Sequence, residues 1–504
     1  MGRFSIFFIA MLTFLSHIPF WSRPFEMDEG FYAYGGWQML KGLVMYRDLY
    51  DFKPPGIYFL NALTFYLTSP DAVNVYVCAA FFSVGTALGV YFAGKSLWGK
   101  NVGLLGAFLF AVFSTNPQVQ GGCVNAEVFM ILPFIWAFYF IIKGMSSNSR
   151  IYYFIGGSLI SMATLFKQVA GIELLIGLVA IYWKARQRDV SLRKSMYCAI
   201  IFLAGFVMPW FFFAGYFLYK GAFKDFFFWL FEFPVHYILL NKTTDSQTGV
   251  MYRELWLWIT KGSVILWFLS FAAIIVMLKR REIKEKLLVL LFFYSLFAVS
   301  LGLWFPHYFI QLLPLLSLLA AGGIMILYGY FRKKWLRISK YIIIGLLLMT
   351  CAEYVGNNYK FYLQYSGDDI SVQEYRRFFG DFPIFGVARK VGLALKDITK
   401  PEDTIYVWAA EPQINFYAQR RTPARTPVFV WGLFKMLNED QVLMEDLNRN
   451  KPDYVVVFEP LSRSIRFYAF LKEHYVGLYG IKGLNAPYGQ GIYKRKPEAL
   501  NPKH

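Results

Sequence analysis

The sequence contains an apolar run, FSIFFIAMLTFLSHIPFW (Phe4–Trp21), followed almost directly by an acidic cluster, EMDEG (Glu26–Gly30). The run has the length of a bilayer span and contains no Asp, Glu, Lys or Arg. Similar runs recur down the chain, and only 16% of its 504 residues are charged, against about 25% in soluble proteins. Because lipid offers no hydrogen bonds to the backbone, these runs predict an α-helical polytopic membrane protein.

We expect about eleven transmembrane helices, with several short enough to be tilted or to cross only partly. They cover residues 4–21, 72–94, 102–117, 126–142, 151–166, 169–183, 195–219, 255–278, 287–305, 308–329 and 341–353. The first run could instead be a cleaved signal peptide. No small-residue cleavage site follows Trp21, so we expect a retained anchor.

The basic residues indicate the orientation. The net charge of +19 is spread over alternate short loops, which is typical of topology signals and not of nucleic-acid binding. These loops are Lys95–Lys100, Lys143–Arg150, Lys184–Lys194, Lys279–Lys286 and Arg332–Lys340. The positive-inside rule places them and the N-terminus in the cytoplasm. The first loop, residues 22–70, and the residues after 353 then lie outside the cytoplasmic membrane, near outer juxtamembrane helices.

The last part of the chain has a different pattern. Pro401–Trp408 and Lys451–Phe458 each predict a turn followed by a buried strand. Glu411–Arg420 and Asn438–Arg449 predict helices, and glycines punctuate a closing hairpin over 475–495. We therefore expect a transmembrane domain over residues 1–353 and a small extracytoplasmic α/β domain over residues 354–504.

The first loop carries more charge than a connection between apolar helices needs. Asp28 and Glu29 come directly after the first span, Phe31–Val44 predicts an amphipathic helix along the membrane surface, and charges continue to Lys53. Carboxylates near lipid are costly and tend to be kept for function. An interfacial anchor would use Trp, Tyr and Lys instead, so the pattern favours a functional site.

These residues resemble the membrane-embedded C-type glycosyltransferases, in particular the bacterial relatives of the dolichyl-phosphate-mannose protein mannosyltransferases, including the aminoarabinose transferases that modify lipid A of lipopolysaccharide. The resemblance starts from Asp28-Glu29 and Asp51-Phe52-Lys53-Pro54-Pro55-Gly56. It continues in Asn125-Ala126-Glu127, Phe166-Lys167-Gln168 and Pro306-His307-Tyr308-Phe309, over about the first 330 residues.

The resemblance implies the C-type fold and an inverting transfer of a sugar from a polyprenyl-phosphate donor to a hydroxyl of a lipid, glycan or protein of the cell envelope. Asp28 matches the family's base, and Glu29 matches its partner, with an orienting role. Lys53 matches the lysine that faces the donor phosphate. Further candidates for the phosphate are Arg47, Lys167 and His307, and candidates for contact with the substrates are Asn125, Glu127, Gln168 and Tyr308.

Several of these residues have ordinary structural alternatives. Lys167 could snorkel from a helix end, His307 beside Tyr308 could anchor the chain at the interface, and Glu127 could simply face water. In the aminoarabinose transferases an acid before the lysine and a histidine from another loop hold a divalent metal. Here Phe52 precedes Lys53, so an Asp51–His236 metal site is only a possibility that the resemblance raises. No other cofactor is implied.

Two other classes compete with a transferase. A transporter or lipid flippase would have paired halves and ionisable groups at the bilayer midplane, whereas here the polar groups gather at outer span ends. A receptor-like or structural protein would leave the acids and the Lys53-Pro54-Pro55 loop unexplained. The four cysteines lie too far apart for a disulfide framework or a metal-ligand spacing. The sequence does not specify the sugar or the acceptor.

Overall fold

The computed structural model describes residues 2–147, 149–187, 191–235, 263–300, 305–330, 384–426, 439–458, 463–478 and 491–497, with a few single positions between 253 and 356. His236 and the basic segment Arg332–Lys340 lie outside the described residues. The same holds for the last expected span, 341–353, apart from single positions.

Helices dominate the chain as far as Tyr330. They are α1 (Gly2–His17), α2 (Met27–Leu40), α3 (Gly56–Leu67), α4 (Ala72–Trp98), α5 (Lys100–Phe113), α6 (Ala126–Ser146), α7 (Ile151–Thr164), α8 (Leu174–Gln187), α9 (Leu192–Tyr219), α10 (Phe223–Phe227), α13 (Val264–Lys279), α14 (Ile283–Ser300) and α15 (Leu313–Tyr330). Short 3-10 turns join them: η1 (Ile18–Phe20), η2 (Pro117–Val119), η3 (Gln168–Glu173) and η5 (Pro306–Leu312), with a π-helical turn η4 (Phe228–Glu232).

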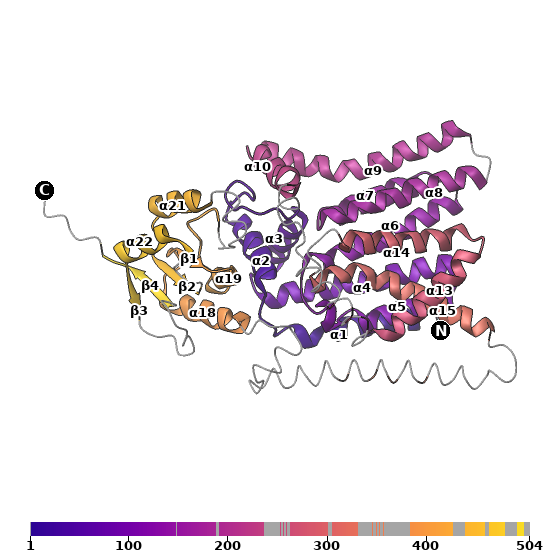
Figure 1. Cartoon of the computed structure of the whole chain (residues 1–504), viewed down its shortest axis with the longest axis horizontal. Helices are drawn as coiled ribbons and strands as arrows, with labels where there is room; N and C mark the ends of the chain where they lie inside the picture. Colours follow the sequence, from indigo (N-terminus) through magenta and orange to yellow (C-terminus); the bar gives the residue numbers. More distant parts are fainter. Residues whose placement is uncertain are drawn as a thin grey trace.

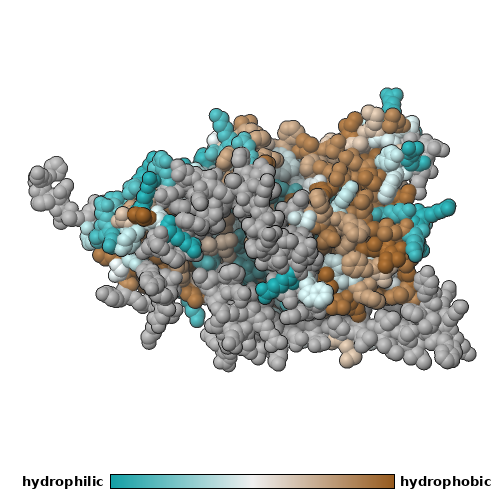
Figure 2. Space-filling view, viewed as in Figure 1, coloured by the Kyte–Doolittle hydropathy of each residue, from teal (hydrophilic) through white to brown (hydrophobic). Residues whose placement is uncertain are grey.

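The long helices lie side by side, with the N-terminus at the end away from the C-terminal region (Figure 1). Figure 2 shows a hydrophobic surface over these helices and a more hydrophilic one over the C-terminal region. Five helical segments of the described chain are long and apolar enough to cross a membrane: Ala72–Trp98, Ala126–Ser146, Gln168–Arg186, Leu192–Tyr219 and Pro306–Leu327. The predicted class of helical membrane protein is confirmed.

The expected spans agree with the helices where both can be compared. Each span from 4–21 to 308–329 overlaps at least one described helix, and 255–278 does so through α13. Shorter apolar helices, including α5, α7 and α13, account for several of them. The number of spans stays a prediction.

Helix α2 begins inside the acidic cluster. Asp28 and Glu29 form its first turn, where carboxylates favour the exposed N–H groups and the helix dipole. Glu26 precedes the helix, and its backbone N–H donates to the Glu29 carboxylate over 2.7 Å. This reciprocal capping fixes where α2 starts and therefore where the two acids point.

Our expectation that Phe31–Val44 is an amphipathic helix along the membrane surface is wrong. Helix α2 ends at Leu40, and all its residues from Glu29 to Gln38 are buried. Helix α3 packs against it from the membrane part, and α19 (Gln413–Ala418) packs against it from the C-terminal region. The helix is therefore enclosed by protein, which its own residues could not reveal.

The C-terminal region contains a mixed sheet of four strands, ordered β1-β2-β4-β3. Strands β1 (Ile405–Trp408) and β2 (Tyr454–Val457) are parallel, whereas β4 (Gly491–Arg495) is antiparallel to both β2 and β3 (Tyr475–Leu478). The predicted strands, helices and closing hairpin all overlap observed elements. Helix α18 (Ile384–Ile398) and helix α22 (Ile465–His474) were not predicted.

Alternate residues of β1 face two small cores. Ile405 and Val407 pack with α18 and α19, whereas Tyr406 and Trp408 pack with α21 (Glu439–Arg449) and α22. Because a parallel pair needs a crossover between its strands, the chain between β1 and β2 includes α19 and α21. The sheet is thus covered by helices on both faces, and α19 on one face is also the contact to α2.

The C-terminal region docks directly on α2. The Phe25 N–H donates to the Tyr417 hydroxyl over 2.8 Å, and the Thr422 N–H donates to the Tyr34 hydroxyl over 2.7 Å. Gly30 faces Gln413 so closely that an added Cβ would lie 2.8 Å from the Gln413 Cα atom. A glycine is therefore needed at this position for α19 to approach the helix that carries Asp28 and Glu29.

Candidate active site

Asp28 and Lys53 form what we call the acid–lysine pair. The Lys53 ammonium lies 3.5 Å from Oδ2 of Asp28, and the side chains are 15% and 31% exposed respectively. The Tyr32 hydroxyl, one helical turn beyond Asp28, donates to the same oxygen over 3.3 Å. The carboxylate is thus held by two long contacts and remains accessible, as a group that must meet a substrate should be.

The loop before α3 fixes the position of Lys53. The Tyr46 hydroxyl donates to the Lys53 carbonyl over 2.7 Å, and the Gln168 side-chain amide donates to the Phe52 carbonyl over 2.9 Å. Burial by itself would lower the pKa of Lys53, but Tyr32, Asp28 and other neighbours raise it well above its ordinary value. Lys53 is therefore a fixed positive charge, while Gln168 supports the loop.

A second group gathers around Glu127 and is called here the Glu127 cluster. It consists of Glu127 at the start of α6, Lys167 before η3, and His307 and Tyr308 in η5. Lys167 forms an ion pair with Glu127 and lies 3.2 Å from the centre of the Tyr308 ring. The His307 Nε2 atom is 3.9 Å from a Glu127 oxygen.

The two groups act on one another. Glu127 and Tyr308 both help to raise the pKa of Lys53. In turn, Asp28 raises and Lys53 lowers the pKa of Lys167. Burial lowers the pKa of Lys167 to about 8, with Lys53 acting in the same direction and Glu127 opposing it. The structure therefore brings together residues that lie far apart in the sequence.

Asn125 lies directly before α6 and is buried. Its side-chain Nδ2 has no hydrogen-bond partner among the described residues. A buried amide donor without a partner is costly, so this group is free to donate to an oxygen of a bound molecule. The predicted substrate contact at Asn125 thus has a physical basis, although it stays a prediction.

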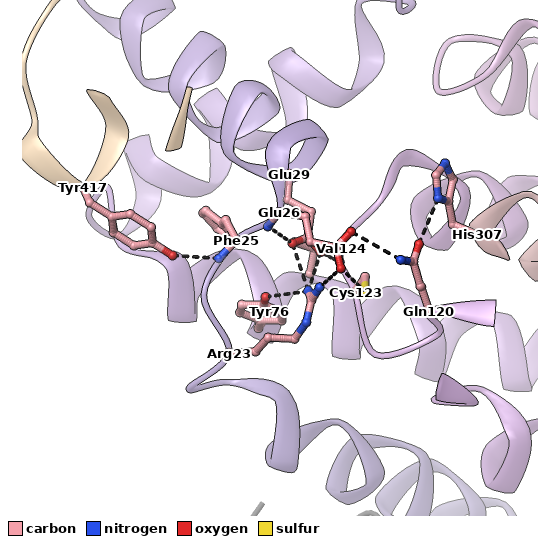
Figure 3. Close-up of polar contacts among 10 residues, drawn as sticks. All are labelled: Arg23, Phe25, Glu26, Glu29, Tyr76, Gln120, Cys123, Val124, His307 and Tyr417. Atoms are coloured by element: carbon pink, nitrogen blue, oxygen red, sulfur yellow. Dashed lines mark hydrogen bonds and ion pairs between the residues drawn. The ribbon is translucent and has the colours of Figure 1, made fainter. Parts of the chain in front are cut away.

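Glu29 lies in a different environment from Asp28. Figure 3 shows it in a network that we call the arginine node, consisting of Arg23, Glu26 and Glu29. Nη1 of Arg23 donates to both Glu29 oxygens over 3.0 and 2.9 Å, and Nη2 pairs with Glu26. The Val124 N–H also donates to Glu29, over 2.6 Å. Because the Glu29 side chain is 0% exposed and both its oxygens accept hydrogen bonds, it is placed to orient α2, in line with the predicted orienting role.

The arginine node was not anticipated from the sequence, apart from Glu29. The Arg23 and Glu29 side chains are 1% and 0% exposed, and Tyr76 of α4 accepts a further bond from Arg23 over 3.3 Å. Burial raises the pKa of Glu26 to about 7, whereas Arg23 opposes that shift. The available signal was a charged residue two positions after an apolar span, where an unpaired charge would be costly.

Of two further predicted residues, Arg47 lies apart from these groups, whereas Asp51 lies near the acid–lysine pair, whose Lys53 and Asp28 both act on its pKa. Arg47 is 43% exposed on its side chain, pairs with its neighbour Asp48 and donates to the Lys220 carbonyl. Asp51 is bonded to the Tyr58 hydroxyl, and burial raises its pKa to about 6. No group of three or more potential metal ligands occurs in the part of the chain that the structure describes. The possible Asp51–His236 metal site stays untested, because His236 lies outside that part.

Residues 52–212 match the family model described as dolichyl-phosphate-mannose-protein mannosyltransferase. The fold matches ArnT from Cupriavidus metallidurans bound to undecaprenyl phosphate, with a TM-score of 0.61 and 14% identity over 97% of each chain. The chain has the C-type glycosyltransferase fold. This fold also relates it to the Archaeoglobus fulgidus oligosaccharyltransferase, with a TM-score of 0.56 and 13% identity over 97% of this chain and 73% of that one.

A third C-type structure is the mycobacterial arabinofuranosyltransferase AftD, with a TM-score of 0.53 and 15% identity over 99% of this chain and 40% of AftD. No curated protein sequence matches the chain. The predicted resemblance, fold and class of membrane glycosyltransferase are confirmed by the family match and the shared C-type fold. The alternative of a transporter or flippase finds no support in these comparisons.

Proposed function

We propose that the protein transfers a sugar, with inversion, from a polyprenyl-phosphate donor to a hydroxyl of an envelope lipid, glycan or protein. The reaction takes place at the outer face of the bacterial cytoplasmic membrane. The observation that carries this proposal is the acid–lysine pair at the start of α2. It places a carboxylate and a fixed ammonium, both partly accessible, within 3.5 Å of each other.

The chemistry needs both groups. The acceptor oxygen attacks the anomeric carbon, and the bond from that carbon to the phosphate oxygen breaks. The acceptor proton passes to Asp28, because a hydroxyl has a high pKa and is a poor nucleophile while it keeps its proton. The bonding electrons leave with the polyprenyl phosphate, whose growing negative charge Lys53 stabilises. No step needs a further reactant.

The length of the Asp28–Lys53 contact suits this exchange of partners. A contact of 3.5 Å is at the limit of a hydrogen bond. A donor phosphate can therefore bind the Lys53 ammonium and leave the Asp28 carboxylate for the acceptor. Lys167 supplies a second positive charge in the neighbouring Glu127 cluster, and the unpartnered Nδ2 of Asn125 supplies a donor for a substrate oxygen.

Two proteins of the same fold support a polyprenyl-phosphate ligand. ArnT binds undecaprenyl phosphate, and the oligosaccharyltransferase of Archaeoglobus fulgidus binds a dolichol phosphate together with an inhibitory peptide. The position of the C-terminal region also supports an outer site, since it packs on α2 at the end of the helices away from the N-terminus (Figure 1). The basic loops of the sequence predict that this N-terminus lies in the cytoplasm.

The test uses the purified full chain with a panel of labelled polyprenyl-phosphate sugars. We expect enzyme-dependent cleavage of the sugar–phosphate bond with at least one donor, and transfer when a hydroxyl acceptor is present. A parallel assay in liposomes follows movement of the same lipids between leaflets. Lipid movement without cleavage of any donor would overturn the proposal in favour of a flippase.

A further inference from the structure

Gln120 connects the arginine node to the Glu127 cluster. Its side-chain Nε2 lies 3.4 Å from Oε2 of Glu26, and its Oε1 lies 3.0 Å from Nδ1 of His307 (Figure 3). The residue follows η2 with a φ of +54°, a left-handed conformation that is uncommon for residues other than glycine. The turn before α6 therefore adopts a costly conformation that presents this side chain between two elements.

The chemistry of the two neighbours determines which way the amide points. The Glu26 carboxylate is paired with Arg23 and, when ionised, can only accept hydrogen bonds. The amide NH2 of Gln120 must then face Glu26, and its carbonyl oxygen must face His307. A carbonyl oxygen can only accept, so the proton of the neutral imidazole must be on Nδ1.

This arrangement also determines whether the other ring nitrogen, Nε2, carries a proton. The Nε2 atom of His307 faces Glu127, 3.9 Å from one of its oxygens. The charges of Asp28, Lys53 and Lys167 also contribute to the electrostatic potential at this ring. With the proton on Nδ1, the neutral ring carries its lone pair on Nε2, so this atom is a hydrogen-bond acceptor inside the proposed site.

We propose that Gln120 is a positioning residue that orients His307 so that Nε2 accepts a hydrogen bond from a hydroxyl of the sugar or of the acceptor. The proposal rests on the proposed function and extends it to a residue that the sequence motifs did not single out. Gln120 acts on the site only through His307, and Glu26 acts on His307 only through Gln120. The arginine node therefore serves both α2 and the orientation of a histidine in η5.

A double-mutant cycle tests this coupling. Gln120→Met keeps the size of the side chain and removes both hydrogen bonds, and we expect kcat/KM to fall roughly tenfold, the value of one hydrogen bond. His307→Ala removes the ring. In that background Gln120→Met is expected to have no further effect. Gln118→Met, in the adjoining 3-10 turn η2, is the matched control and leaves activity unchanged. Gln120→Asn, which is too short to bridge both neighbours, replaces Gln120→Met if that variant does not fold.

The outcomes distinguish a failure of the Gln120 proposal from a failure of the proposed function. If the wild-type protein transfers sugar and the effects of the two substitutions multiply, Gln120 acts independently of His307 and the proposal is wrong. If the wild-type protein cleaves no donor, the proposed function fails instead. A second measurement does not depend on activity: nitrogen-15 NMR of histidine-labelled protein at pH 8, above the pKa of Glu26 of about 7.

In that spectrum the signals of His307 are identified by their loss in His307→Ala. We expect wild-type His307 to carry its proton on Nδ1, and Gln120→Met to shift the ring toward a mixture of tautomers. A wild-type proton on Nε2 would overturn the assignment of the amide and with it the proposal.

Discussion

Asp28 and Glu29 are neighbours in sequence with opposite surroundings. In the acid–lysine pair, Asp28 is 31% exposed and has long contacts to Lys53 and Tyr32. In the arginine node, Glu29 is fully buried and accepts bonds from Arg23, Glu26 and Val124. A reactive carboxylate must be able to exchange partners, whereas a scaffold carboxylate must not. Two adjacent acids thus divide chemistry and support between them.

The strongest test of this division is Asp28→Asn. The substitution keeps the size of the side chain but removes the ability to accept a proton, so we expect turnover to fall by about 10²–10⁴-fold. Thermal stability should hardly change, because the side chain is partly exposed and loosely bonded. The measurements are the rate of sugar transfer and the melting temperature. Near-normal transfer by a folded protein would show that Asp28 is not the base.

Lys53→Ala tests the other half of the pair. A contact that strengthens as the phosphate gains charge affects turnover as well as donor affinity. We expect kcat and kcat/KM to fall together, by about 10²-fold. Lys53→Arg should restore only part of the rate, because a planar guanidinium does not reproduce a point charge. A rise in KM with kcat unchanged would mean that Lys53 binds the donor without assisting cleavage.

Glu29→Gln should show the reverse of Asp28→Asn. Breaking a buried ion pair leaves an uncompensated charge, so we expect a loss of about 3 kcal/mol in the free energy of unfolding. Transfer by the protein that remains folded should fall less than in Asp28→Asn. The comparison uses both variants in the same melting and transfer assays. If Glu29→Gln is stable and inactive, the roles of the two acids are exchanged.

Gly30→Ala tests whether the C-terminal region supports α2. The added Cβ would lie 2.4 Å from the Gln413 Cβ atom, and overpacking of this kind costs about 1–3 kcal/mol. We expect lower stability and a lower kcat, because α2 must shift with Asp28 in its first turn. Gly215→Ala in α9 is the control, since nothing lies within 4 Å of its added Cβ. If the two variants have the same stability and the same kcat, the packing of α19 on α2 does not affect the site.

The smallest expected effect concerns the neighbouring Glu127 cluster and pH. The pKa of Lys167, lowered by burial to about 8, means that Lys167 is charged below about pH 8 and loses its proton above it. We expect kcat/KM for the donor to decline as pH rises from about 7 to 9. Lys167→Arg keeps its charge throughout and should flatten this decline. An unchanged profile in that variant would assign the titration to another group.

Local features of the sequence predicted much of the molecule. Long apolar runs predicted the helices, and short apolar runs after turns predicted the strands, because these patterns follow from nearby residues. The acids at the end of the first span also indicated where the proposed site lies. The burial of α2 could not be predicted in the same way, since it depends on Gln413 and Tyr417, which are far away in the chain.

The roles of individual charges were harder to predict for the same reason. Arg23 finds both its acidic partners within six positions, but whether that group is buried depends on Tyr76 and Val124 from later elements. Arg47 and Lys53 look alike as cations in one loop, yet Arg47 pairs with the adjacent Asp48 at the surface. Which of these cations is buried, at the surface or in the candidate site depends on contacts with distant segments, and not on the type of residue.

The hydrogen bond from Phe25 to Tyr417 spans 392 positions of the chain, and this has a consequence for biosynthesis. The ribosome makes α2 long before it makes α19, so the side of α2 that faces α19 stays uncovered until the C-terminal region has been translated and has folded. During membrane insertion Asp28 therefore sits on a helix with incomplete packing. The candidate site is therefore completed late, when the C-terminal region packs on a helix that was synthesised long before it.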